Sequence, residues 1–218
     1  MPRAFSEQER ELIRQQLLEH GYRLFTSYGL RKTNVEEIAR AVGISKGAFY
    51  GFYESKEALL MDVIEQAEIR LREEVLAVVS QPGPSPRARL YAVLHRAFDL
   101  FTEMPILQIF TGSDYDLLFR RIPAETLQEH LSNDLAFIQE LIDRCRESGI
   151  PVQVRAENLV GLLYPLVLSI LHEEDFGLQG YRNNLNALLE MVAAYSLGEI
   201  ELEHAIIPEL DLTELEQK

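Results

Sequence analysis

A helix, a tight turn and a second helix are encoded in residues 33–57, and this stretch constrains the fold of the chain more than any other. Thr33 is followed three residues later by Glu36, which is the spacing of a capping box, so a helix is expected to start there. Apolar residues then recur at helical spacing up to Val42. Gly43 follows at a position suited to the positive φ that ends many helices. The stretch is therefore predicted to be a helix-turn-helix.

The second helix of this motif is expected over about residues 46–52, after Ser45, a residue type that caps helices. A helix this short is marginal in water by itself, so neighbouring elements must hold it. Lys46 and Lys56 each follow a serine and stand at the first position of a helix, where the macrodipole disfavours a cation. A nucleic-acid phosphate would remove this misfit. Lysine side chains that simply point into water are an equal alternative.

Residues 33–59 closely resemble the DNA-binding motif of the TetR (tetracycline repressor) family. The resemblance rests on the threonine before Val-Glu-Glu-Ile-Ala, the turn Val-Gly-Ile-Ser-Lys-Gly, the aromatic run Phe-Tyr-Gly-Phe-Tyr and the Ser-Lys-Glu-Ala-Leu that follows. With Leu24, Phe25 and Gly29 it covers about residues 10–65, and it fades further along the chain.

The resemblance implies an all-α protein of two domains. Residues 1–54 would form a three-helix helix-turn-helix DNA-binding domain, and residues 55–218 a larger helical ligand-binding and dimerisation domain. The periodicity of the chain favours the same fold class, because no segment has the period of a strand. Outside the motif, helices are expected over residues 6–28, 55–79, 87–102, 124–148, 156–173 and 181–197.

The resemblance also implies which residues bind DNA. Hydroxyl and ammonium groups of the motif suit phosphates, whereas Ala48 and Gly51 match positions that face bases in relatives. Phe49 and Tyr53 are expected in the core. The short helix carries no arginine, asparagine or glutamine, so it offers poor bidentate base reading, and DNA shape must contribute to specificity. The predicted DNA-binding residues are Thr33, Lys46, Gly47, Ala48, Tyr50, Gly51 and Lys56.

The net charge of −14 is distributed unevenly along the chain. The first 60 residues hold nine Lys and Arg against eight Asp and Glu, and the remaining residues hold twelve against twenty-seven. A nearly neutral part can approach phosphates, while the acidic part is repelled by them. An acidic protein with a chance cluster of lysines is the alternative, which the motif disfavours.

Other signals point away from membranes, metals and catalysis. The N-terminus has no apolar signal region, and the apolar run 159–171 is too short for a membrane span, so a cytoplasmic protein is expected. Cys145 is the one cysteine, which excludes an internal disulfide or a cysteine-rich zinc site. His172 to Asp175 are consecutive and rarely could point at one metal ion. We expect no enzyme, no cofactor and no metal.

An aromatic and thioether set in the acidic part favours a largely apolar pocket for a small-molecule effector. Such residues at helical spacing usually belong to a plain core. These, however, gather around residues 104–123, which glycine and proline break into short helical pieces. The predicted ligand-binding residues are Phe98, Phe101, Met104, Phe110, Tyr115, Phe119, Phe137 and Tyr164.

The expected helix 156–173 is apolar nearly all round, more than one core face requires. It could be a fully buried central helix. Alternatively, it meets its own copy in a second subunit together with helix 181–197, as the resemblance implies. The predicted interface residues are Leu159, Leu163, Leu166, Ile170, Leu185, Leu188 and Val192.

The sequence thus favours a ligand-responsive transcriptional regulator. We expect a repressor that binds a near-palindromic double-stranded operator as a homodimer and is released by a small, mostly apolar effector. The alternative is a small-molecule-binding helical protein with a vestigial DNA-binding domain, which the sparse base-reading surface suggests.

Overall fold

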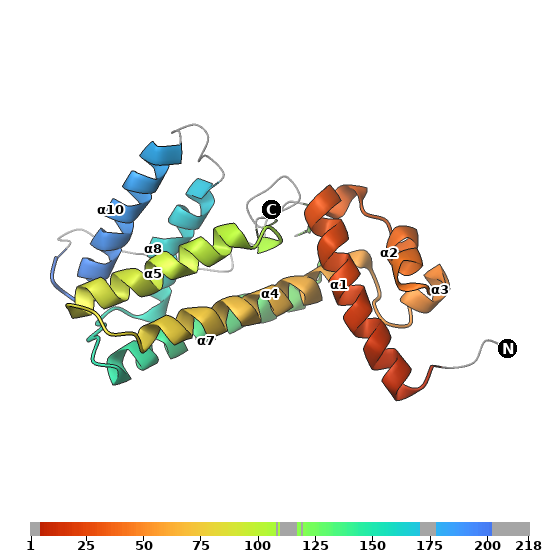
Figure 1. Cartoon of the computed structure of the whole chain (residues 1–218), viewed down its shortest axis with the longest axis horizontal. Coiled ribbons are helices and arrows are strands. Elements are labelled where there is room, and N and C mark those ends of the chain that lie inside the picture. Colours follow the sequence, from red (N-terminus) through yellow and green to blue (C-terminus); the bar gives the residue numbers. More distant parts are fainter. Residues whose placement is uncertain (1–4, 108, 110–116, 119, 171–177, 202–218) are drawn as a thin grey trace. The chain divides into compact units, whose positions relative to one another are not determined.

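The computed structural model describes residues 5–107, 109, 117–118, 120–170 and 178–201 of the 218-residue chain. Every regular element in these ranges is helical, which confirms the predicted all-α fold. The elements labelled in Figure 1 are α1 (Glu7–Lys32), α2 (Val35–Val42), α3 (Lys46–Phe49), α4 (Lys56–Val79), α5 (Pro86–Glu103), α7 (Ala124–Glu147), α8 (Ala156–Ser169) and α10 (Leu178–Ser196).

The chain divides into two compact units. The first comprises Met1–Arg70 and Phe101–Leu127, and the second comprises Leu71–Leu100 and Gln128–Lys218. Helices α4, α5 and α7 each begin in one unit and end in the other, so continuous helices join the two units. The functional division between residues 54 and 55 that the sequence suggests remains a prediction.

Local hydrogen bonds and a close packing contact define α1. The Ser6 hydroxyl accepts a hydrogen bond from the Glu9 N–H at 3.2 Å, and the Glu9 carboxylate accepts one from the Ser6 N–H at 2.7 Å, which is a capping box. Gly29 interrupts the helix with a φ of 75°. At Gly21 a Cβ would lie 3.2 Å from the Leu59 side chain, so the glycine lets α4 pack closely against α1.

The capping box predicted for Thr33 and Glu36 is wrong, because α2 begins after Asn34. The Asn34 side chain accepts a hydrogen bond from the Glu37 N–H at 2.9 Å. Thr33 instead ends α1, where its N–H and hydroxyl both donate to the Gly29 carbonyl, at 3.3 and 2.8 Å. That carbonyl lies where α1 is interrupted and needs donors, so Thr33 belongs to the preceding helix.

The turn of the motif follows the prediction, but its second helix is shorter than expected. Gly43 ends α2 with a φ of 75°, and the Ile44 N–H returns to the Ala39 carbonyl at 2.9 Å. Helix α3 then ends at Phe49, and residues 50–52 form a turn in place of the predicted last helical residues. Gly51 lies in this turn, and glycine is a poor helix former.

In the second unit, Arg89 of α5 joins the ends of two other helices. Its guanidinium donates to the carbonyl oxygens of Val79 at 3.0 Å, Gln81 at 3.2 Å and Ser148 at 2.9 Å. These carbonyls lie at the ends of α4 and α7, where backbone oxygens lack helical partners. One side chain therefore supplies donors to carbonyl groups at the ends of two helices.

The last two helices differ slightly from their predicted spans. Helix α8 ends at Ser169 and α10 begins at Leu178, while residues 171–177 and 202–218 lie outside the described part of the chain. The run from His172 to Asp175 falls there too. Within the described ranges, no helix is long and apolar enough to cross a membrane.

A substitution of Gly43 tests the role of the turn. We expect Gly43→Ala to lower the free energy of unfolding by about 1–2 kcal/mol, because an alanine is strained at a positive φ. A Cβ at Gly43 meets nothing within 4 Å, so the effect isolates backbone strain. Urea unfolding provides the measurement. Gly47→Ala is the control: its Cβ would meet only Ser45 Oγ at 3.9 Å, and an equal loss there would contradict the assignment.

Candidate nucleic-acid interface

Buried aromatic side chains hold the short helix α3 in place. The Ser45 hydroxyl accepts a hydrogen bond from the Ala48 N–H at 3.0 Å and so caps the helix. Phe49 is fully buried, and its ring centroid lies 6.1 Å from that of Tyr53, which is also buried. Both were predicted in the core. Tyr50, by contrast, is 50% exposed. Three other predicted DNA-binding residues lie in this region. Gly47 and Gly51 are exposed, and Ala48 is half-buried.

Lys46 forms an ion pair with Glu36 within the protein. Its Nζ lies 2.5 Å from Glu36 Oε1 of α2, and both side chains are about half exposed. The hydrogen bond between them raises the pKa of Lys46 and lowers that of Glu36. The pair offsets the cost of a cation at the start of α3. Since the pair is exposed, a phosphate could replace the carboxylate.

Lys56 is bound more firmly than the sequence suggests. Its ammonium group donates to the carbonyl oxygens of Leu30 and Thr33, both at 2.6 Å, in a partly buried position. These carbonyls belong to the end of α1 and the connection to α2. The lysine therefore stabilises the junction of α1 and α4, and two of its three donors are used inside the protein.

Thr33 is not at the surface, contrary to the prediction that it contacts DNA. It is only 1% exposed, and its hydroxyl donates to the Gly29 carbonyl at 2.8 Å. A side chain buried in this way cannot reach a phosphate. Its role is to end α1 and to supply a carbonyl to Lys56.

Arg10 and Arg14 were not identified from the sequence as residues of this site. They lie one turn apart on α1. Arg10 Nη2 donates to the Gly51 carbonyl at 3.0 Å, and its guanidinium lies 4.7 Å from the ring centroid of Phe52. Arg14 lies 3.7 Å from Asp62, whose carboxylate accepts a hydrogen bond from the Tyr53 hydroxyl at 2.9 Å. Their spacing of four residues was the available signal, but it is also typical of a solvated helix face.

Tyr53 is buried and helps to hold the turn after α3 against α4. Burial and then the hydrogen bond to Asp62 raise the pKa of Tyr53 far above its ordinary value. The phenol is therefore a permanent donor that joins the turn after α3 to α4.

The predicted ligand-binding residues are only partly described. Phe98 is buried, Phe101, Met104 and Phe137 are half-buried, and Tyr164 is 51% exposed. Phe137 lies beneath a guanidinium, with Arg72 Cζ 5.5 Å from its ring centroid. Phe110, Tyr115 and Phe119 lie outside the described residues.

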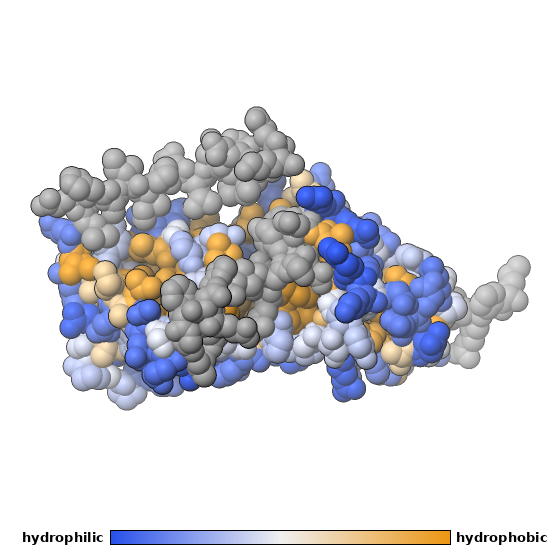
Figure 2. All heavy atoms as spheres, turned by 90° about the horizontal axis from the view of Figure 1, so that it is seen from above, coloured by the Kyte–Doolittle hydropathy of each residue, from blue (hydrophilic) through white to orange (hydrophobic). Residues whose placement is uncertain are grey.

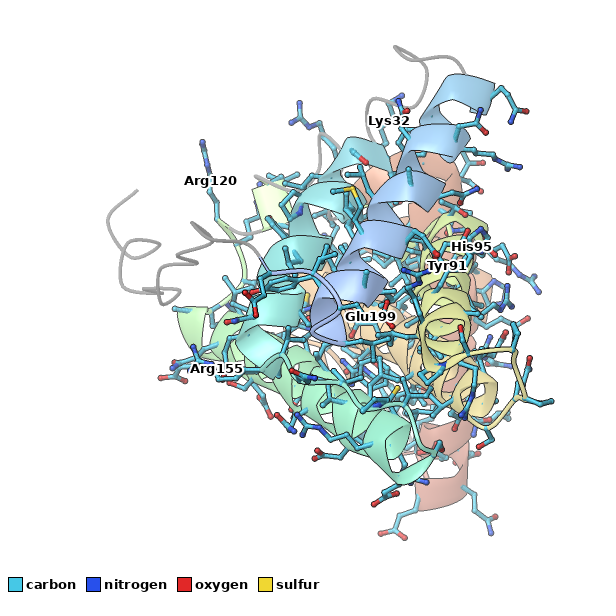
Figure 3. The ribbon with its side chains drawn as sticks, turned by 90° about the vertical axis from the view of Figure 1, so that its left-hand side faces the viewer. Lys32, Tyr91, His95, Arg120, Arg155 and Glu199 are labelled. Atoms are coloured by element: carbon cyan, nitrogen blue, oxygen red, sulfur yellow. The ribbon has the colours of Figure 1, made fainter. Side chains whose placement is uncertain are left out.

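A groove in the second unit is lined by other residues, including Val78, Tyr91 and His95. Figure 3 shows Tyr91 and His95 next to each other on α5. His95 Nδ1 lies 2.9 Å from Asp99, and the ring centroids of Tyr91 and His95 are 5.6 Å apart. This groove contains none of the predicted ligand-binding residues.

The predicted interface residues fall into two groups. Leu159 and Val192 are buried within the single chain, at 2% and 8% exposure, so they are not available to a partner. Leu163, Leu166, Ile170 and Leu185 are half-buried, and Leu188 is 43% exposed. Met191, which was not predicted, is 56% exposed and lies on the same helix as Leu188. In Figure 2, hydrophobic surface is visible among hydrophilic residues of the second unit.

Cys145 offers no reactive thiol. The side chain is buried, and burial raises its pKa to about 11. A protonated, inaccessible thiol is a poor nucleophile.

The geometry of α2, the turn and α3 defines a helix-turn-helix DNA-binding domain. Residues 17–63 match the family model described as "Bacterial regulatory proteins, tetR family". This match lies in the N-terminal part of the chain and confirms the resemblance to the TetR family inferred from the sequence.

Two curated relatives share part of this chain. The HTH-type transcriptional regulator AcrR of Shigella flexneri is 34% identical over 89 residues, which are 41% of each chain. The HTH-type transcriptional regulator YuxN of Bacillus subtilis (strain 168) is 29% identical over 125 residues, or 54% of this chain and 43% of YuxN. The chain thus spans about two fifths of the length of these relatives. Both are named as regulators and neither as an enzyme.

A solved structure shares the fold over most of the chain. FadR from Thermus thermophilus, a TetR family transcriptional repressor in complex with lauroyl-CoA, superposes with a TM-score of 0.61. The match covers 90% of this chain and 99% of that one, at 23% sequence identity. It confirms an N-terminal helix-turn-helix domain followed by a larger helical domain.

The different surroundings of the two lysines predict different effects on stability. Lys56→Met should lower the free energy of unfolding by about 1–3 kcal/mol, because two partly buried carbonyls lose a charged donor. Lys46→Met should leave stability unchanged, since an exposed ion pair contributes little. Urea unfolding of both variants measures this difference in stability, and each variant has lost one lysine charge. Equal stability of the two variants would contradict a structural role for Lys56.

Proposed function

We propose that this chain is a ligand-responsive transcriptional repressor. In this proposal it binds a near-palindromic operator as a homodimer, and a small, mostly apolar effector releases it. The observation that carries the proposal is a helix-turn-helix whose short second helix is anchored by buried Phe49 and presents exposed Lys46, Gly47, Tyr50 and Gly51. The names of the relatives, AcrR and FadR, support the same class.

Phosphate contacts supply most of the DNA affinity in this proposal. Lys46 and the hydroxyl of Tyr50 are accessible for such contacts, which position a protein on DNA without reading sequence. The small residues Ala48 and Gly51 allow the backbone to come close to the bases. Lys56 then contributes chiefly by holding α4 against the end of α1.

The first turn of α4 supports coupling between effector and DNA. Glu57 is buried and lies 3.1 Å from Arg121, which precedes α7 in the first unit. The neighbouring Lys56 binds the carbonyls of Leu30 and Thr33. Glu57 thus joins the first turn of α4 to the segment before α7, and Lys56 joins the same turn to the end of α1 and the start of the helix-turn-helix. A rearrangement of that segment on effector binding would be transmitted to the position of α2 and α3.

The alternative of a small-molecule-binding protein with a vestigial DNA-binding domain has an observation in its favour. Lys46 is already paired with Glu36, and Lys56 donates to two carbonyls, so neither lysine is a fully available cation. The two proposals differ in whether the chain binds duplex DNA.

Operator selection followed by effector titration tests the leading proposal. The wild-type chain should select near-palindromic duplexes from a random pool and bind them less tightly as salt is raised. Ligands found by thermal shift, with lauroyl-CoA among the compounds screened, should weaken operator binding by roughly 5- to 150-fold. By linkage, the operator should weaken ligand binding by the same factor.

Two outcomes would contradict parts of this proposal. Absence of salt-dependent duplex binding would support the vestigial domain. A ligand that raises the melting temperature while operator affinity stays the same would be no effector.

The proposed homodimer is tested at Leu188, an exposed apolar residue of α10. Leu188→Arg should give the mass of a single chain by light scattering at micromolar concentration, because a charge would be buried in the contact. The wild type should give twice that mass. Leu12→Arg is the matched control, since Leu12 is 57% exposed on α1, away from α8 and α10 in sequence. A dimer that survives Leu188→Arg would place the contact elsewhere.

A further inference from the structure

Arg10 holds a positive charge against the end of α3, the recognition helix of the proposed DNA site. It lies on α1, 41 residues before Gly51, yet its Nη2 donates to the Gly51 carbonyl at 3.0 Å. Its guanidinium also lies 4.7 Å from the ring centroid of Phe52. Both partners belong to the turn that directly follows α3. The position of this charge is therefore fixed relative to the recognition helix by two contacts.

Most of the guanidinium of Arg10 remains available to a ligand. A guanidinium has five N–H donors, and one of them bonds to Gly51. Contact with an aromatic ring uses the face of the group and leaves its edges open. The residue is exposed, and no carboxylate pairs with it among the described residues. Arg14 and Lys46, by contrast, are paired with Asp62 and Glu36.

We infer that Arg10 is a phosphate-binding residue of the DNA site, an inference that rests on the proposed function. Lys46 lies at the start of α3, and Arg10 lies at the turn beyond its end. A short helix in the major groove has a phosphate backbone on either side. A planar guanidinium binds a phosphate through two parallel hydrogen bonds, and a group that is already oriented loses little freedom on binding.

Two roles of Arg10 can be separated by the salt dependence of binding. A residue that only positions α3 changes affinity without changing the number of counterions released. A residue that neutralises a phosphate changes the slope of log K against log salt by about 0.9. The slope is therefore the readout that a purely structural role does not alter.

The experiment measures binding of a duplex selected by the wild-type chain, over a series of salt concentrations. Arg10→Gln should lower the slope by about 0.9 for each subunit engaged. Arg10→Met should do the same while keeping aliphatic contact with Phe52. Arg10→Lys should retain the slope, since it retains the charge. Arg14→Gln is the matched control: it removes the same charge one turn away, but Asp62 already offsets that charge, so the slope should be unchanged.

The outcomes distinguish this inference from the proposed function. A wild-type chain that binds with a slope unaltered by Arg10→Gln and Arg10→Met would overturn the role of Arg10 alone, even if affinity fell. A wild-type chain without salt-dependent binding would overturn both. Equal slope losses in Arg10→Gln and Arg14→Gln would also overturn the inference, because they would reflect net charge. Thermal melting of each variant establishes that it is folded.

Discussion

Burial of Phe49 is the interaction on which the short helix α3 depends. Helix α3 has four residues, and a helix of that length does not persist in water without tertiary contacts. Phe49 is completely buried, with Tyr53 packed near it and tied to Asp62 of α4 by its hydroxyl. The orientation of Phe49 determines which neighbouring side chains face outward. Removal of this anchor would abolish the presented surface as a whole.

The electrostatics of the domain are more internal than its composition suggests. Nine basic residues among the first 60 indicate a surface prepared for phosphates, yet several of them serve the protein itself. Lys46 pairs with Glu36, Arg14 with Asp62 and Arg23 with Glu19. In the proposed DNA-binding role, such pairing would leave the phosphate contacts to a few charges fixed by geometry.

Local chemistry predicted much of the fold, and long-range contacts account for what it missed. The turn at Gly43, the cap at Ser45 and the burial of Phe49 each follow from a residue and its near neighbours. The internal hydrogen bonds of Lys56 were not predicted, because its carbonyl partners lie 23 and 26 residues earlier. Arg10 was missed because Gly51 is 41 residues away and contributes only a backbone oxygen, which carries no side-chain signal. Thr33 could be assigned to either adjoining helix, and the interruption at Gly29 decided between them.

The three hydrogen bonds of Arg89 have a mechanical consequence. They join the end of α4, the loop after it and the end of α7 to one side chain of α5. The loop contains Pro82, Pro84 and Pro86, whose rings restrict the backbone. A tilt of α4 about its far end would have to stretch these bonds or carry α7 and α5 along. This end of α4 is therefore held firmly, and it can move only if these hydrogen bonds break or if α5 and α7 move with it.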